Sequence, residues 1–176
     1  MNHEPIRYSS VAPVPPAAAF ERFTTRMGAW WPSRNSLLSA PQSRVVIEPW
    51  VGGRWFEEAE NGEQCTWGRV LVWEPPYRLM LAWQLNVAET SPDHCESQLA
   101  FDPALVTEVE LRFVELDAHR TLVELEHRNL DRFTLPTDAA RILGGESGWP
   151  TILRLYSTTE PAPRPRESAH GRSTPA

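Results

Sequence analysis

Apolar and polar residues alternate with a period of two in the second half of the chain. This period is typical of a β-strand, whose successive side chains point to opposite faces of the sheet. Two consecutive segments, 106–116 and 120–128, show it most clearly. Their shared apolar face comprises Val109, Leu111, Phe113, Val123, Leu125 and His127. The acidic residues of 108–126 alternate with these apolar residues, so we expect them on the opposite, solvated face. One apolar face and one solvated face predict an antiparallel sheet that is covered on one side.

The same reasoning predicts more strands, separated by turn residues. They span residues 6–11, 44–50, 53–60, 65–74 and 77–85. Asn61-Gly62 predicts a hairpin with a type I′ turn, and Pro75-Pro76 predicts the next turn. The glycines in 52–54 follow a strand and do not open a helix, so they predict a tight turn and not a phosphate-binding loop. The polar segment 86–103 is expected to be a loop.

The direction in which strand 65–74 faces is left open by its residues. One set of alternate positions contains Trp67, Arg69, Leu71 and Trp73, and the other contains Gly68, Val70 and Val72. Both sets are plausible core. Arg54, Glu57 or Arg69 would reach the interior only if their strands turn them inward.

Helices are predicted at both ends of the chain. After Pro15-Pro16, an apolar stripe at helical spacing ends at Gly28. Thr137 is expected to cap a short helix that stops at Gly144-Gly145, and another begins near Pro150. The stripes comprise Phe20, Phe23 and Met27 at the start, and Trp149, Ile152, Leu153 and Tyr156 at the end. These helices must pack on the apolar sheet face, which predicts an α+β fold.

Length and composition indicate one soluble domain. The 176 residues fit a single domain, which we place at 1–159, and the proline-rich residues 160–176 are expected to form a disordered tail. The net charge of −6 argues against nucleic acid as a partner. Cys65 and Cys95 form one disulfide at most, and neither a secretory signal nor a membrane span is present. We therefore expect a cytoplasmic protein with free thiols.

The ordered set of segments resembles a known superfamily. The matching pieces are VAPVPPAAAFERFTTRMGAWWP, IEPWVGGRWFE, WGRVLVWEPPYRLMLAW, TEVELRF, LVELEHRNLDR and GGESGWPTIL. They resemble the helix-grip superfamily of START-related domains, birch-pollen-type allergens and polyketide cyclases. Within it, the chain is similar to bacterial relatives of the activator of the heat-shock chaperone ATPase. The resemblance implies a curved sheet of six or seven strands gripping a C-terminal helix, with an internal apolar cavity.

Eight tryptophans in so short a chain favour a ligand-lined cavity over plain core filling, although any one of them is most simply a core residue. The sequence therefore predicts the binding of a small hydrophobic molecule that is lipid-like, aromatic or polyketide-like. The predicted ligand-binding residues are Trp31, Trp55, Trp67, Trp83, Leu111, Phe113, His127 and Trp149.

His127 supports an alternative function. An imidazole among apolar groups is a candidate general acid–base for a cyclase- or hydrolase-type enzyme, or simply a buried histidine satisfied by its neighbours. A third alternative, implied by the resemblance, is regulation of a chaperone ATPase, although the eukaryotic activator carries an additional N-terminal domain. The sequence assigns no catalytic residue.

No metal or cofactor is expected. Residues 93–96 contain metal-ligand types, but they lie in a predicted loop and no second cluster completes a site. An edge strand of the sheet would allow a homodimer, which the sequence neither requires nor excludes.

Overall fold

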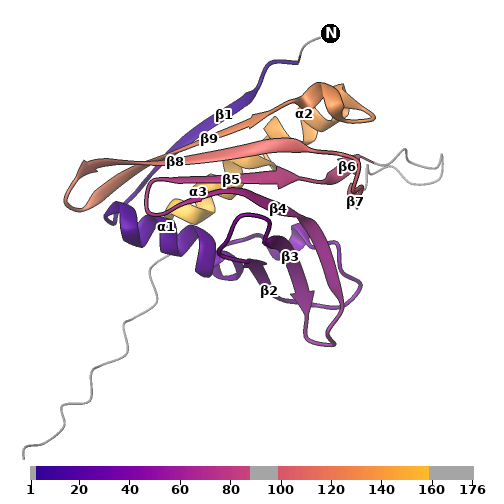
Figure 1. Cartoon of the computed structure of the whole chain (residues 1–176), viewed down its shortest axis with the longest axis horizontal. Helices are drawn as coiled ribbons and strands as arrows, with labels where there is room; N and C mark the ends of the chain where they lie inside the picture. Colours follow the sequence, from indigo (N-terminus) through magenta and orange to yellow (C-terminus); the bar gives the residue numbers. More distant parts are fainter. Residues whose placement is uncertain (1–2, 88–98, 159–176) are drawn as a thin grey trace, which may run out of the picture.

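The chain folds around one antiparallel sheet of seven strands in the order β1-β9-β8-β5-β4-β3-β2. A computed structural model describes residues 3–87 and 99–158. Figure 1 shows the strands curling around α3, with α1 near one end of the sheet and α2 near the other. The strands of this sheet are β1 (Ile6–Ala12), β2 (Gln42–Ile47), β3 (Arg54–Ala59), β4 (Gln64–Glu74), β5 (Arg78–Trp83), β8 (Thr107–Asp117) and β9 (Arg120–Arg128). The α-helices are α1 (Pro16–Thr25), α2 (Pro136–Gly144) and α3 (Trp149–Thr158).

The inner face of the sheet is apolar, as the alternation predicted. The six side chains assigned to the apolar face of β8 and β9 are all buried. The predicted stripes of α1 and α3 pack against them: Phe20 and Phe23 contact Phe113, and Tyr156 contacts Phe23. The predicted α+β architecture is therefore confirmed.

Two β-bulges decide how β4 faces. Its pairing with β3 shifts beside Trp67, and its pairing with β5 shifts beside Leu71. Each bulge adds one residue and so reverses which alternate side chains face inward. As a result, Trp67, Val70 and the partly buried Trp73 all reach the core. Neither of the two alternating sets considered from the sequence is therefore correct. Arg69 lies outside and is exposed.

Gly68 lies between these bulges, paired with both neighbouring strands. A β-carbon on Gly68 would collide with the carbonyl oxygen of Ala82. Only glycine lets the two strands approach this closely.

Several local predictions were wrong. The segment 86–103 is not simply a loop, because a small sheet joins β6 (Leu85–Val87) to β7 (Leu99–Phe101). Thr137 does not cap α2, which begins at Pro136 without a side-chain capping bond. The 61–62 hairpin exists, but only Gly62 has a positive φ, of 85°, so its turn is not type I′.

Some predictions fall outside the described residues. They concern Cys95, residues 93–96 and the tail at 160–176. Cys65 is a free cysteine. The single domain over 1–159 stays a prediction.

Candidate functional site

An apolar pocket of about 500 Å³ opens between the inner face of the sheet, the connection after α1, and the α2–α3 region. Its lining residues are Trp31, Arg34, Asn35, Ser36, Leu37, Leu38, Trp67, Trp83, Leu85, Leu99, Ile142, Leu143, Ser147, Gly148 and Ile152. Three indole rings and seven aliphatic side chains therefore provide most of its wall. Such a surface removes an apolar ligand from water.

The pocket wall belongs to a larger cluster of tryptophans. Trp31 lies beside Trp67, with ring centroids 4.8 Å apart, and contacts Trp55 and Trp149 at 6.3 Å. Trp83 contacts Trp55 at 5.6 Å and Trp149 at 5.7 Å. The five predicted tryptophans thus form one network, in which Trp31, Trp67 and Trp83 line the pocket while Trp55 and Trp149 pack behind them.

Leu111 and Phe113, which we also predicted as ligand-binding residues, lie elsewhere in the core and do not line this pocket. The ring of Phe113 packs 5.3 Å from that of Phe20, on α1. Their parity on β8 was predicted correctly, but the curvature of the sheet separates this part of its inner face from the pocket.

The indole N–H groups of the cluster are unequally satisfied. Trp67 donates to a Glu57 oxygen at 3.2 Å, Trp83 to the Leu85 carbonyl at 2.8 Å, and Trp149 to His127. Among the described residues, the buried Nε1 atoms of Trp31 and Trp55 have no hydrogen-bond partner. A buried donor without a partner is costly, so these two atoms are unusual in a folded protein.

Glu57 is a fully buried carboxylate on the inner face of β3. Its oxygens accept hydrogen bonds from the Ser36 hydroxyl at 2.8 Å, the Leu37 N–H at 2.7 Å, the Gln42 side-chain amide at 2.6 Å and the Trp67 indole. All four donors are uncharged. Because Ser36, Leu37 and Trp67 line the pocket, Glu57 joins two parts of its wall.

His127 is buried and both of its ring nitrogens are engaged. The Trp149 indole can only donate, so the Nδ1 of His127, 3.1 Å away, must accept. In the neutral ring the proton is then on Nε2, which lies 2.8 Å from the Thr107 hydroxyl oxygen. The Thr107 hydroxyl lies 3.4 Å from the Trp83 carbonyl, to which it donates. Burial lowers the pKa of His127 to about 3, which keeps the ring neutral.

This arrangement matches a buried histidine satisfied by its neighbours. His127 is not among the residues that line the pocket. The Trp149 ring lies beside it, with ring centroids 6.0 Å apart. His127 therefore orients a tryptophan of the cluster in this structure.

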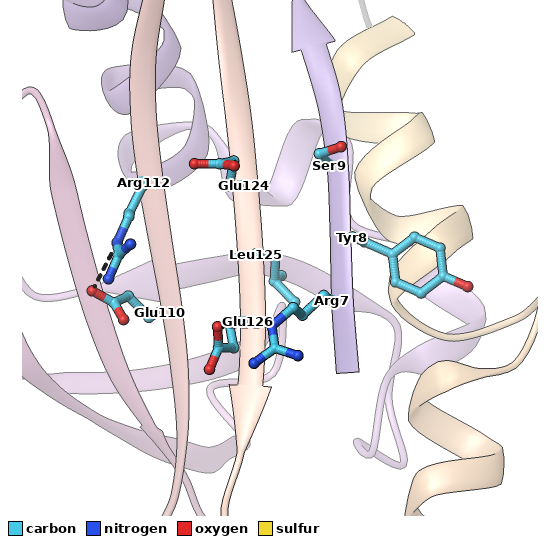
Figure 2. A pocket seen from close by; sticks show the side chains of 8 residues that line it. All are labelled: Arg7, Tyr8, Ser9, Glu110, Arg112, Glu124, Leu125 and Glu126. Atoms are coloured by element: carbon cyan, nitrogen blue, oxygen red, sulfur yellow. Dashed lines mark hydrogen bonds and ion pairs between the residues drawn. The ribbon is translucent and has the colours of Figure 1, made fainter. Parts of the chain in front are cut away.

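A second hollow, of about 520 Å³, lies on the outer face of β1, β9 and β8. Figure 2 shows the side chains around it, with Arg7 beside Glu126 and Arg112 directed at Glu110. Its lining residues are Arg7, Tyr8, Ser9, Glu110, Arg112, Glu124, Leu125 and Glu126. Charges of both signs surround it, so it is a polar surface depression.

Glu110 corrects the expectation that the outer acidic residues are solvated, because its side chain is only 3% exposed. It pairs with Arg78 at 2.7 Å, Arg112 at 3.2 Å and Arg128 at 3.1 Å. Burial by itself raises the pKa of Glu110, but hydrogen bonds from Arg78 and Arg112 and the charges of Arg112 and Arg128 outweigh it, so the pKa is lowered. Long arginine side chains folded over the sheet bury this carboxylate.

The sequence reasoning missed much of the pocket wall. Arg34 and Leu38 come from the connection between α1 and β2, and Ile142 and Leu143 come from α2; none of these was predicted as a ligand-binding residue. Glu57 was considered but could not be assigned a face. For α2, the apolar pair at 142–143 within the predicted helix was the available signal.

The helices of the described residues, 3–87 and 99–158, are short. None of the helices there combines the length and the apolar character needed to cross a bilayer. No cluster of three or more histidine, cysteine or acidic side chains suited to a metal ion occurs in residues 3–87 and 99–158.

Solved structures share the fold. An anthrahydroquino-γ-pyrone synthase, Txn09, is 29% identical over 90% of this chain and 98% of its own, with a TM-score of 0.58. CalC, a self-sacrificing resistance protein from Micromonospora echinospora, is 26% identical over 87% of this chain and 91% of its own, with a TM-score of 0.62. The protein MLL2253 from Mesorhizobium loti, 19% identical over 88% of this chain and 94% of its own (TM-score 0.55), shares the fold.

A search of curated proteins gave no match. The family described as Activator of Hsp90 ATPase homolog 1-like protein matches residues 13–156, which is most of the chain. This match and the solved structures confirm the predicted helix-grip superfamily. The chain therefore belongs to the Activator of Hsp90 ATPase homolog 1-like protein family.

Proposed function

We propose that this protein binds a small, largely apolar molecule in the pocket lined by Trp31, Trp67 and Trp83. The observation that carries the proposal is the pocket itself, with a volume of about 500 Å³ and a wall of indole rings and aliphatic side chains. Ligand sites in proteins typically enclose roughly 300–1,000 Å³ and are mostly apolar with a few polar groups. Family membership and fold support ligand binding or cyclase-type activity in general.

Titration with N-phenyl-1-naphthylamine tests this proposal, because the probe is neutral and its fluorescence rises in an apolar site. We expect saturable binding at one site, accompanied by quenching of tryptophan fluorescence. Ile142 lines the pocket and is partly exposed, so Ile142→Trp should fill part of the volume and weaken binding roughly tenfold or more.

The control is Leu116→Trp, which adds the same ring at an exposed position 47% accessible to solvent, away from the pocket. It should bind the probe like the unchanged protein. No saturable binding, or equal binding by both variants, would refute the proposed site.

A cyclase- or hydrolase-type reaction is the second candidate, favoured by the 29% identity to a synthase. The general acid–base that we predicted for it is His127. In this structure a proton transfer by His127 would require Trp149 or Thr107 to move, since they occupy its two nitrogens. Mass spectrometry of a bound aromatic ligand after incubation tests for turnover, and recovery of unchanged ligand argues against the reaction.

Regulation of a chaperone ATPase stays a prediction of the family resemblance. The direct measurement is the ATPase rate of Hsp90 with and without this protein. An unchanged rate, together with no association in a pull-down, would remove it.

A further inference from the structure

Among the described residues, the wall of the pocket carries positive charge alone. Arg34 is the one ionisable side chain among the described residues that line it. In a chain with a net charge of −6, this leaves an apolar pocket with a cationic group in its wall. Most described arginines pair with an acid, whereas Arg34 is exposed and has neither an ion pair nor a hydrogen bond within the described residues.

The indole N–H of Trp31, in the same wall, is a donor that a ligand does not reach. The side chain is buried, with 7% of the residue exposed, and its Nε1 is enclosed by protein atoms without a partner among the described residues. Trp31 and Arg34 are three residues apart, joined through Pro32 and the single 3₁₀ turn Ser33–Asn35. Arg34 is therefore the donor of this connection that a ligand oxygen can reach, because its side chain is exposed and lines the pocket.

Glu57 indicates which way such a ligand would lie. Its carboxylate is beneath Ser36 and Trp67, and its oxygens are already occupied by four donors. A second negative charge near Trp67 would be repelled. An anionic group is consequently favoured at Arg34, with the apolar body against the rings of Trp67 and Trp83.

We propose that the pocket selects aromatic carboxylic acids, with the carboxylate paired to Arg34 and the aromatic body against the indole rings of the wall. This inference rests on the proposed function and adds a ligand class to it. Arginine suits this role because its guanidinium matches the geometry of a carboxylate.

Three matched compounds test the proposal: anthracene-2-carboxylate, its methyl ester and 2-methylanthracene. The acid carries a charge and acceptor oxygens, the ester carries acceptors alone, and the hydrocarbon carries neither. At low ionic strength and pH 7.5 we expect the affinity order acid, ester, hydrocarbon. Because Arg34 is exposed, water screens the pair, and the acid should be preferred by a few-fold over the ester.

Arg34→Met should reduce the preference for the acid over the ester by a few-fold and leave hydrocarbon binding unchanged. The matched control is Arg69→Met, which removes the same charge from an exposed position outside the pocket. If the acid preference survives in Arg34→Met, or falls equally in Arg69→Met, the assignment to Arg34 is wrong.

The outcomes separate the two proposals. Equal affinity of the unchanged protein for all three compounds would overturn the acid preference and leave apolar ligand binding intact. Failure to bind any of them, together with no binding of N-phenyl-1-naphthylamine, would overturn the proposed function itself.

Discussion

Replacing Glu57 offers a direct test of how the pocket wall is held in place. The variants Glu57→Gln and Glu57→Met have similar side-chain lengths but remove different numbers of acceptors. In Glu57→Gln, the amide nitrogen can face the Ser36 hydroxyl and the Gln42 amide, both of which are able to turn and accept. The amide oxygen can then keep the bonds from Leu37 and Trp67, so the loss is about 1–2 kcal/mol from weaker, uncharged hydrogen bonds.

Glu57→Met should be much more damaging. The Leu37 N–H and the Trp67 indole can only donate, so the first would lose its acceptor in a partly buried place and the second in a fully buried one. An unsatisfied buried donor costs about 1–3 kcal/mol, which applies in full to Trp67 and in part to Leu37, so the pair costs about 2–4 kcal/mol. This is a large share of the roughly 5–15 kcal/mol that stabilises a typical domain. Affinity for a pocket ligand should also fall, because Ser36 and Leu37 form part of the wall.

Urea unfolding followed by tryptophan fluorescence measures both changes in the free energy of unfolding. The control is Glu63→Met, since Glu63 also accepts bonds from the connection, at Ser39 and Ala40, but is only partly buried and water can replace it. Glu63→Met should cost much less than Glu57→Met. Our account is refuted if Glu57→Met costs no more than Glu57→Gln, or if Glu63→Met costs as much.

Three further predictions concern positions outside the pocket wall. Because burial lowers the pKa of His127 from 6.5 to about 3, the unfolded chain binds more protons between these values, and stability should fall as pH drops below about 6.5. His127→Gln should flatten that pH dependence in urea titrations, and an unchanged slope would contradict the assignment. Gly68→Ala should cost about 2 kcal/mol or more, measured as a lower Tm, because its β-carbon would collide with the Ala82 carbonyl; an unchanged Tm would show that the strands relax. Glu110→Gln should lower the free energy of unfolding by about 1–2 kcal/mol, because three arginines lose the carboxylate that they share. Glu124→Gln, on the exposed outer face, should change it little. Equal effects of the two variants would mean that the Glu110 network contributes nothing.

Local pattern was sufficient for the strands and helices of the core. The alternation in β8 and β9 placed Val109, Leu111 and Val123 on the buried face, because side-chain direction in a regular strand depends only on position along it. The stripe of α3 likewise identified its buried side. The turn at 61–62 was located correctly by its glycine, although its type was wrong.

Only the tertiary structure decided which side chains line the pocket. The facing of β4 depends on bulges opposite two different strands, which a regular alternation does not describe. The roles of Glu57 and Glu110 depend on partners that lie up to 32 residues away and meet only in the folded sheet. The sequence therefore determined a curved sheet with a tryptophan-rich interior, because periodicity is local. Which tryptophans line a void, and which fill it, followed from how the strands curve and how α2, α3 and the α1–β2 connection close over them.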